Sequence, residues 1–291
     1  MKTYLDCIPC FFKQALEAAR LAGATPATQK KILNELSKAI PRISLTSSPP
    51  EMGGVIYGLV EKLTKKKDPF KRVKDKSNRL ALGVYDTLKK RVSHSNDRLL
   101  TAVELAIAGN IIDYGVRRSL DVGKEIKKIL DKEHRIIRRE STRFFNYPKF
   151  KRALKKAKTV LYLADNTGET VFDRVLIEEI KHLDKDKRII YAVKEKPIIN
   201  DALIEDAYQC GIDKVADIIS SGLNIPGTIL SLCSKEFLKI YKKADMIISK
   251  GQGNFEALSE HKKPVFFLFM AKCPVVARDI GCEEGDVILL G

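Results

Sequence analysis

Residues 159–180, TVLYLADNTGETVFDRVLIEEI, decide how this chain folds. Residues 159–164 are a short, mostly apolar run of strand length. The polar turn DNTGE (165–169) follows at once, and apolar residues then return at helical spacing. The stretch therefore predicts a strand, a tight turn and a helix, with Asp165 and Asn166 at the carboxyl end of the strand. Ligands of open parallel sheets bind at that edge.

This polar turn has two interpretations that its own residues do not separate. Asn166 is a good helix N-cap, and Glu169 follows three residues later, as in a capping box. The same side chains can equally belong to a ligand site. The choice depends on what the rest of the chain brings to the same edge.

The composition is that of a globular protein. The chain has 291 residues, of which 44% are hydrophobic and 31% charged, so it is long enough to bury a large core. No apolar run approaches the ~20 residues of a membrane span. The N-terminus carries Asp6 and lacks the apolar segment of a signal peptide. We therefore expect a cytoplasmic protein that has no membrane partner.

Positive charge is concentrated in the first half of the chain. Residues 1–150 contain 31 Lys and Arg against 16 Asp and Glu, whereas residues 151–291 contain 22 against 21. A basic half can bind nucleic acid, steer anionic substrates into a cleft, or be the lysine-rich surface of a heat-adapted protein. The asymmetry indicates two regions with different roles.

The cysteines do not indicate a disulfide framework, because the chain is expected in a reducing compartment. Cys7 and Cys10 form a single CxxC pair, which offers too few ligands for a structural zinc ion. A redox pair, an occasional disulfide and two half-buried thiols all remain compatible with it.

The chain changes character after a predicted linker at residues 146–148. Before it, helices are predicted at 10–23 and 27–40, from about Glu51 after a loop at 43–54, and at 69–88, 99–116 and 119–145. Beyond it, strands are predicted at 159–164, 188–193, 217–220, 245–249, 264–269 and 286–290, with helices between the first five. Such alternation is typical of a mainly parallel sheet covered on both faces. We therefore expect an α/β protein with a helical domain at 1–148 and a sheet domain at 149–291.

The predicted helix 99–116 is apolar on nearly every side but contains Asn110 and Asp113, which share a face. A buried carboxylate is costly unless it is paired or binds a metal or ligand. Either both residues contact substrate, or the helix ends near Gly109 and they only decorate its last turn. We favour substrate contact, because the neighbouring Ile111-Ile112 pair implies burial.

Loops that follow parallel strands meet at one edge of a sheet. Asp165 and Asn166 follow the first strand and Asp201 lies in the loop after the second, so three hard oxygen ligands converge there. Such ligands suit Mg²⁺ or Mn²⁺ rather than zinc.

The later loops offer groups that bind anions. Backbone N–H groups at predicted helix starts lie near Ser221-Gly222 and Lys250-Gly251, and Lys250 and Lys272 add positive charge. Together with an oxygen-bound metal, these groups describe the surroundings of a phosphoryl group.

Several other chemistries are disfavoured. No GxGxxG follows the first strand and no GxxxxGK[ST] is present, which argues against a dinucleotide site and a P-loop. The four histidines lie outside these loops, so no Ser-His or Cys-His nucleophile is visible. Either a carboxylate or a metal-activated water must then attack phosphorus, and we favour Asp165 as the nucleophile.

The chain resembles the damage-control phosphatase family, formerly catalogued as domain of unknown function 89. The resemblance rests on DNTGE (165–169), KPIINDAL (196–203), SKGQGN (249–254) and AGNIID (108–113). It extends over essentially the whole chain, including EMGGVIY (51–57) and DPFKRVKDKSN (68–78). With Cys7 and Cys10, the chain is similar to the branch of the family that has an N-terminal CxxC.

This resemblance implies metal-dependent hydrolysis of small phosphate monoesters, such as sugar phosphates or damaged phosphometabolites, with Mn²⁺, Mg²⁺, Co²⁺ or Ni²⁺ as cofactor. It also implies a helical N-terminal part that closes over a Rossmann-like domain. The family's metal ligands fall on Asp165, Asn166 and Asp201, and its phosphate-contacting lysine falls on Lys272, where the RTxK signature of one branch reads FMAK. Its substrate loop falls on 252–256.

The substrate-binding candidates are therefore spread over several elements; they are Asn110, Asp113, Glu169, Ser221, Gly222, Lys250, Gly251 and Asn254. Two alternative functions remain. The basic half can bind nucleic acid, although no nucleic-acid motif or aromatic platform is present. The other alternative is a Rossmann-like methyltransferase, but this chain lacks the glycine-rich turn that such an enzyme has after its first strand. The sequence does not predict an oligomeric state.

Overall fold

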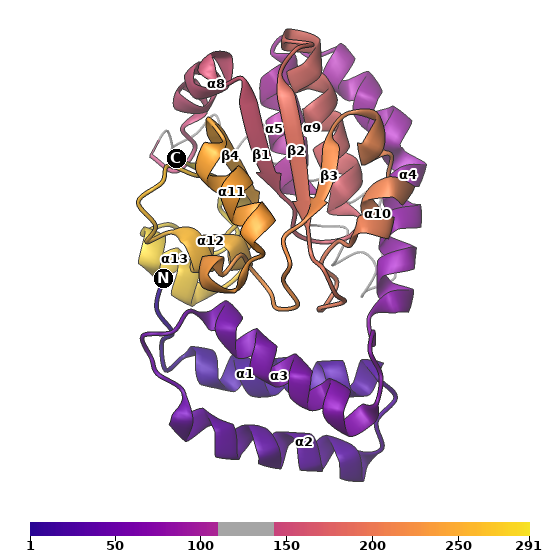
Figure 1. Ribbon diagram of the computed structural model, residues 1–291, viewed down its shortest axis with the longest axis vertical. Coiled ribbons are helices and arrows are strands. Elements are labelled where there is room, and N and C mark those ends of the chain that lie inside the picture. The colour runs from indigo at the N-terminus through magenta and orange to yellow at the C-terminus, as the bar shows by residue number, and fades with distance from the viewer. Residues whose placement is uncertain (110–142) are drawn as a thin grey trace.

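The computed structural model describes residues 1–109 and 143–291, and these residues form a six-stranded sheet flanked by helices (Figure 1). The strands are β1 (Thr159–Leu163), β2 (Arg188–Val193), β3 (Asp217–Ser220), β4 (Met246–Lys250), β5 (Phe266–Met270) and β6 (Val287–Leu290). Each lies within two residues of a strand predicted from the sequence.

The strand order places a ligand-binding crevice between β1 and β4. The order is β3-β2-β1-β4-β5-β6, with β6 antiparallel to β5 and the other pairs parallel. The chain thus builds outward from β1 to β3 and then returns to the other side of β1. This reversal defines doubly wound, Rossmann-like sheets, whose ligands bind where the order changes. The predicted fold class is confirmed.

Helices surround this sheet on three sides (Figure 1). Helices α5 and α9 lie on one face, α11 lies on the other, and α1–α3 form a group beneath the end at which the strands finish. The helices are α1 (Cys7–Leu21), α2 (Pro26–Ala39), α3 (Pro49–Thr64), α4 (Lys71–Ser93), α5 (Arg98–Ala108), α8 (Tyr147–Lys156), α9 (Glu169–Leu183), α10 (Ile204–Gln209), α11 (Lys235–Lys243), α12 (Gln252–Leu258) and α13 (Pro274–Ile280).

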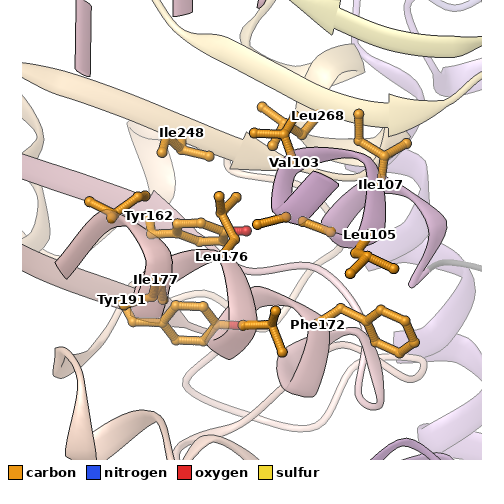
Figure 2. Close-up of a cluster of buried hydrophobic side chains, with 14 of the residues drawn as sticks. Val103, Leu105, Ile107, Tyr162, Phe172, Leu176, Ile177, Tyr191, Ile248 and Leu268 are labelled. Atoms are coloured by element: carbon orange, nitrogen blue, oxygen red, sulfur yellow. The ribbon is translucent and has the colours of Figure 1, made fainter. Parts of the chain in front are cut away.

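The central strand β1 is buried on both faces. Tyr162 belongs to a cluster with side chains of α5 and α9, whereas Leu161 and Leu163 belong to the cluster on the opposite face. Figure 2 shows the first cluster, in which the stacked rings of Tyr162 and Tyr191 lie close to side chains of α9. Alternating apolar side chains on two covered faces fix the register of β1, and therefore the position of the turn that follows it.

A titratable carboxyl group lies inside this core and makes stability depend on pH. Glu104 of α5 is only 4% exposed. Burial raises the pKa of its carboxyl group from 4.5 to about 7, while Arg91 opposes the increase. Between these two values the folded protein keeps a proton that the unfolded chain has lost, so stability falls as the pH rises through this window.

We therefore expect E104Q to be more stable than the wild-type protein at pH 8. The gain should be about 1–3 kcal/mol at pH 8 and should shrink towards zero below pH ~4.5, where both states of the wild type hold the proton. Denaturant unfolding at the two pH values measures this. A difference that does not change with pH would contradict the assignment.

Two local predictions were wrong because capping residues start helices there. The predicted linker at 146–148 is the beginning of α8: the Asn146 side chain accepts a hydrogen bond from the Lys149 N–H at 3.2 Å, and Pro148 occupies the first turn. The loop predicted at 43–54 ends early, because α3 begins at Pro49: Ser48 occupies the N-cap position, and its backbone N–H donates to Glu51 Oε2 at 3.1 Å.

Other predictions reach beyond the described residues. Helix α5 confirms the buried helix predicted from residue 99 as far as Ala108, but Asn110 and Asp113 lie outside the described residues. So does nearly all of the helix predicted at 119–145. The domain boundary at residue 148 stays a prediction, since α5 shares its buried cluster with β1 and α9. Among the described residues, no helix has both the length and the apolarity to cross a membrane.

Candidate active site

The turn after β1 holds two carboxylates together through an amide. Helix α9 begins at Glu169 with Gly168 at its N-cap position, so Asn166 does not cap it and the capping-box interpretation was wrong. Instead, Asn166 Nδ2 donates to Asp165 Oδ2 at 2.7 Å and to Glu169 Oε1 at 2.8 Å. The amide group is therefore oriented by two acceptors.

The loop after β2 joins this turn through backbone bonds. The Ala202 N–H donates to the Asp165 carbonyl at 2.9 Å, and Asn166 and Asp201 form an isolated antiparallel bridge. Asp201 is 2% exposed, and its Oδ2 lies 3.5 Å from Lys194 Nζ. The structure thus brings together the three side chains that were predicted as metal ligands.

The loop after β4 approaches Asp165 so closely that only glycine fits. Gly251 has a φ of +81°, and a Cβ atom built on it would lie 2.1 Å from Asp165 Oδ2. Any side chain at this position would overlap the carboxylate. Asp165 and Gly251 therefore lie opposite one another in the crevice between β1 and β4, where the strand order reverses.

Negative charge is concentrated at this point. Burial raises the pKa of Asp165 well above its ordinary value, the carboxylates of Glu169 and Asp201 raise it further, and Lys272 and Lys250 oppose the shift. Two carboxylates and an amide oxygen are suitable ligands for a hard divalent cation, whose charge would relieve this repulsion. Within 1–109 and 143–291, no group of three His, Cys, Asp or Glu residues has metal-binding geometry.

A pocket of about 290 Å³ opens at these side chains. We call it the inner pocket; Asp165, Asn166 and Asp201 form part of its wall. Helices α1 and α3 and the segment before α4 supply another part. The remaining lining residues are Gln14, Glu17, Tyr57, Phe70, Ile199, Asn200, Pro226, Gly227, Gln252, Gly253 and Lys272.

Lys272 reaches the inner pocket from the loop after β5. Its side chain is half-buried, and its backbone N–H donates to Gln252 Oε1 at 2.9 Å. This bond ties the loop after β5 to the start of α12. A positive charge is thereby placed in the same pocket as the three oxygen ligands, as the sequence predicted.

The comparisons with known proteins agree with this arrangement. The family model of the damage-control phosphatase ARMT1-like domain matches residues 3–288. The chain belongs to this family. The resemblance stated from the motifs is therefore confirmed, although the assignment to the branch with an N-terminal CxxC stays a prediction.

Relatives match this damage-control phosphatase domain along most of its length. An uncharacterized protein of Methanocaldococcus jannaschii is 38% identical, covering 98% of this chain and 94% of its own. The damage-control phosphatase PH1575 of Pyrococcus horikoshii is 34% identical, covering 100% and 98%. A crystal structure of a DUF89 family protein from Pyrococcus horikoshii has a TM-score of 0.88 at 33% identity, covering 100% of this chain and 99% of that one. None of these names supports nucleic-acid binding.

Three predicted site residues of this damage-control phosphatase domain lie behind the pocket instead of on its wall. Lys250 is 1% exposed, and its Nζ donates to Asp173 Oδ1 at 2.6 Å and to Glu169 Oε2 at 3.1 Å. Asn254 is also 1% exposed and donates to the carbonyls of Ala164 and Lys250 at 3.0 and 2.8 Å. Lys250, Glu169 and Asn254 thus connect the turns that carry the pocket residues.

Ser221 and Gly222 are not brought into the inner pocket. No helix begins at this point, and the two amides are already used: the Ser221 N–H donates to the Val193 carbonyl and the Gly222 N–H to Ser220 Oγ. The backbone here supports the end of β3.

The six cysteines are free thiols, and Gln14 Nε2 lies 3.2 Å from Cys10 Sγ.

Sequence reasoning missed the helical wall of the inner pocket, namely Gln14, Glu17, Tyr57 and Phe70. A signal for it is the glycine pair in EMGGVIY. Cβ atoms on Gly53 and Gly54 would lie 2.6 Å from Pro226 and 2.7 Å from Ile225, so α3 can pack against the loop after β3 only with glycine at these positions. This contact brings α3 to the edge of the sheet.

A second missed residue is Asn78 of α4, at the end of the motif 68–78. Its side chain is fully buried; Oδ1 accepts a hydrogen bond from the Gly168 N–H at 2.8 Å, and Nδ2 donates to Asp206 Oδ1 at 2.9 Å. Asn78 therefore fixes the turn that carries Asp165 and Asn166. A polar residue among lysines in a helical pattern does not by itself reveal this role.

Proposed function

We propose that this protein is a metal-dependent phosphatase that hydrolyses small phosphate monoesters, such as sugar phosphates or damaged phosphometabolites. The observation that carries the proposal is the convergence of Asp165, Asn166 and Asp201 in one pocket with Lys272. Membership of the family and the name of the Pyrococcus horikoshii relative support phosphatase chemistry.

The carboxylates of Asp165 and Asp201 and the amide oxygen of Asn166 would hold a divalent cation such as Mg²⁺, Mn²⁺, Co²⁺ or Ni²⁺. Because Asn166 Nδ2 is held by two carboxylates, Oδ1 is the amide atom suited to a cation. When bound, such a cation would neutralise charge on the phosphoryl oxygens and act as a Lewis acid.

The protein side chains would then position the ester. Lys272 contacts the phosphoryl oxygens and stabilises the charge that develops on them. Asp165 Oδ1, the oxygen not bonded by Asn166, attacks phosphorus while the bond from phosphorus to the ester oxygen breaks. The alcohol leaves with a proton from solvent. Water then hydrolyses the acyl phosphate, which releases phosphate and restores the carboxylate.

The general test is a screen of sugar phosphates and nucleotides with several divalent metals. We expect release of phosphate that requires a divalent metal and stops when a chelator is added. Absence of hydrolysis across the screen, with every metal, would overturn the proposed function.

The covalent step has a separate test. Rapid quenching with phosphate-labelled substrate should trap acid-stable, hydroxylamine-sensitive label on a peptide that contains Asp165. Two successive displacements also retain the configuration of a chiral phosphorothioate ester, whereas direct attack by water inverts it. Inversion without trapped label would make water the nucleophile.

Lys272 gives a prediction about catalysis. We expect K272M to lose ~10²–10³ in turnover, because it removes a positioned charge beside the transferred group. Metal affinity should change little, since Lys272 is not among the proposed ligands. Steady-state kinetics and metal titration measure both quantities, with the exposed helix residue variant K62M as a matched control. Turnover within a factor of about two of wild type would place the phosphate site elsewhere.

A further inference from the structure

A second pocket lies directly beside the inner pocket. It has a volume of about 170 Å³, and we call it the outer pocket. Tyr57, Phe70 and Ile199 line both pockets, so these three side chains form the wall between them. The rings of Tyr57 and Phe70 meet edge to face, with centroids 6.2 Å apart. A cavity of ~150 Å³ accepts a molecule the size of benzene, so the outer pocket can hold part of a metabolite.

The outer pocket is positively charged. Lys66 and Lys67 line it from the segment between α3 and α4, and Lys196 lines it from the loop after β2. Two acidic residues, Glu61 and Asp68, line it as well. The Asp68 carboxylate is already neutralised, because Lys74 Nζ binds its Oδ2 at 2.6 Å and the Lys74 side chain is 1% exposed. The three lysines therefore outweigh the remaining acid.

The backbone at the wall between the pockets is strained. Ile199 has a φ of +39°, a left-handed conformation that β-branched residues rarely adopt. The strained residue directly precedes Asn200 and Asp201, which line the inner pocket, and the Asp201 N–H closes a turn onto the Ile198 carbonyl at 3.1 Å. Such strain persists only where the surroundings enforce it, and it is concentrated at ligand sites. The same turn thus shapes both pockets.

We propose that the outer pocket binds the end of the substrate that is remote from the transferred phosphate, and that this end carries a second anionic group. The inference rests on the proposed phosphatase function and deepens it. With one phosphate beside Asp165 and Lys272, the substrate extends past the wall formed by Tyr57, Phe70 and Ile199, and its other end meets the three lysines. The preferred substrates are therefore sugar bisphosphates or phosphorylated sugar acids, and not monophosphates with a neutral tail.

The experiment compares three esters of one sugar: a monophosphate, a bisphosphate and a phosphorylated sugar acid. We expect the wild-type enzyme to favour, in kcat/KM, both esters that carry a second anionic group. In K66Q/K67Q this preference should fall roughly tenfold, as the loss of two exposed charge contacts allows. The control is K30Q/K62Q, which makes the same change in net charge at exposed positions that do not line the pocket and should keep the preference. A fall for the bisphosphate alone would identify phosphate as the second group.

Equilibrium binding separates this inference from the proposed function. Calorimetric titration of the magnesium-loaded protein with the same esters measures the preference for a second anionic group even if no ester is hydrolysed. If hydrolysis fails but K66Q/K67Q still loses a binding preference that K30Q/K62Q retains, the outer pocket binds the second anionic group and the phosphatase assignment is wrong. An equal preference in wild type and K66Q/K67Q, in kinetics or in binding, would overturn the proposed role of the outer pocket in binding a second anionic group.

Discussion

D201N is expected to reduce metal-dependent turnover by more than ~10²-fold at limiting metal, since changes even in groups behind metal ligands cost 10–100-fold in affinity. The substitution keeps the size of a side chain that is 2% exposed but removes one of the two carboxylates proposed to hold the cation. Metal titration by calorimetry and kcat/KM over a range of metal concentrations measure the loss. The control E205Q removes the same charge from an exposed position on α10.

The corresponding change at Asp165 should behave differently. If Asp201 only holds the cation, excess metal should restore part of the activity of D201N. If Asp165 is also the nucleophile, D165N should remain inactive at saturating metal, because an amide cannot form the acyl phosphate. Unchanged metal affinity in D201N, or full turnover of D165N at saturating metal, would contradict the assigned roles.

The sequence could predict the site where the topology leaves little choice. Asp165, Asn166 and Asp201 follow strands of a parallel sheet, and strands of this kind end at one edge, so their convergence follows from the pattern alone. The helical wall could not be found in this way. A helical pattern shows that Tyr57 lies on an amphipathic helix, but only the packing of α3 against Pro226 and Ile225 brings Tyr57 over the sheet edge.

Lys250 illustrates how much one residue at an element boundary matters. The predicted strand ended at Ser249, which placed Lys250 in the loop with the pocket residues. In the structure β4 continues to Lys250, so its side chain points to the same face as Ile248, towards α9. There it meets Glu169 and Asp173. The sequence does not determine where a strand ends to within one residue, and here that residue decides whether a lysine faces substrate or the core.

This location makes Lys250 a determinant of stability. Burial alone would lower the pKa of Lys250, but the carboxylates of Asp173 and Glu169 outweigh this effect and raise it, so the amine stays charged. Tyr162 and Tyr191 also donate to Asp173, at 2.7 and 2.8 Å. Removing the lysine would leave two buried carboxylates without their cation. Breaking a buried pair in this way typically costs ~3–5 kcal/mol.

We therefore expect K250M to be destabilised by about 3–5 kcal/mol in denaturant unfolding, whereas K272M, the same substitution at a half-buried pocket lysine, should change by less than ~1 kcal/mol. The two variants thus separate a lysine that holds the core from one that serves catalysis. K250M/D173N removes one of the orphaned charges and should recover part of the lost stability. Equal stability of K250M and wild type, or no recovery in the double variant, would show that the buried charges are compensated by groups other than Lys250.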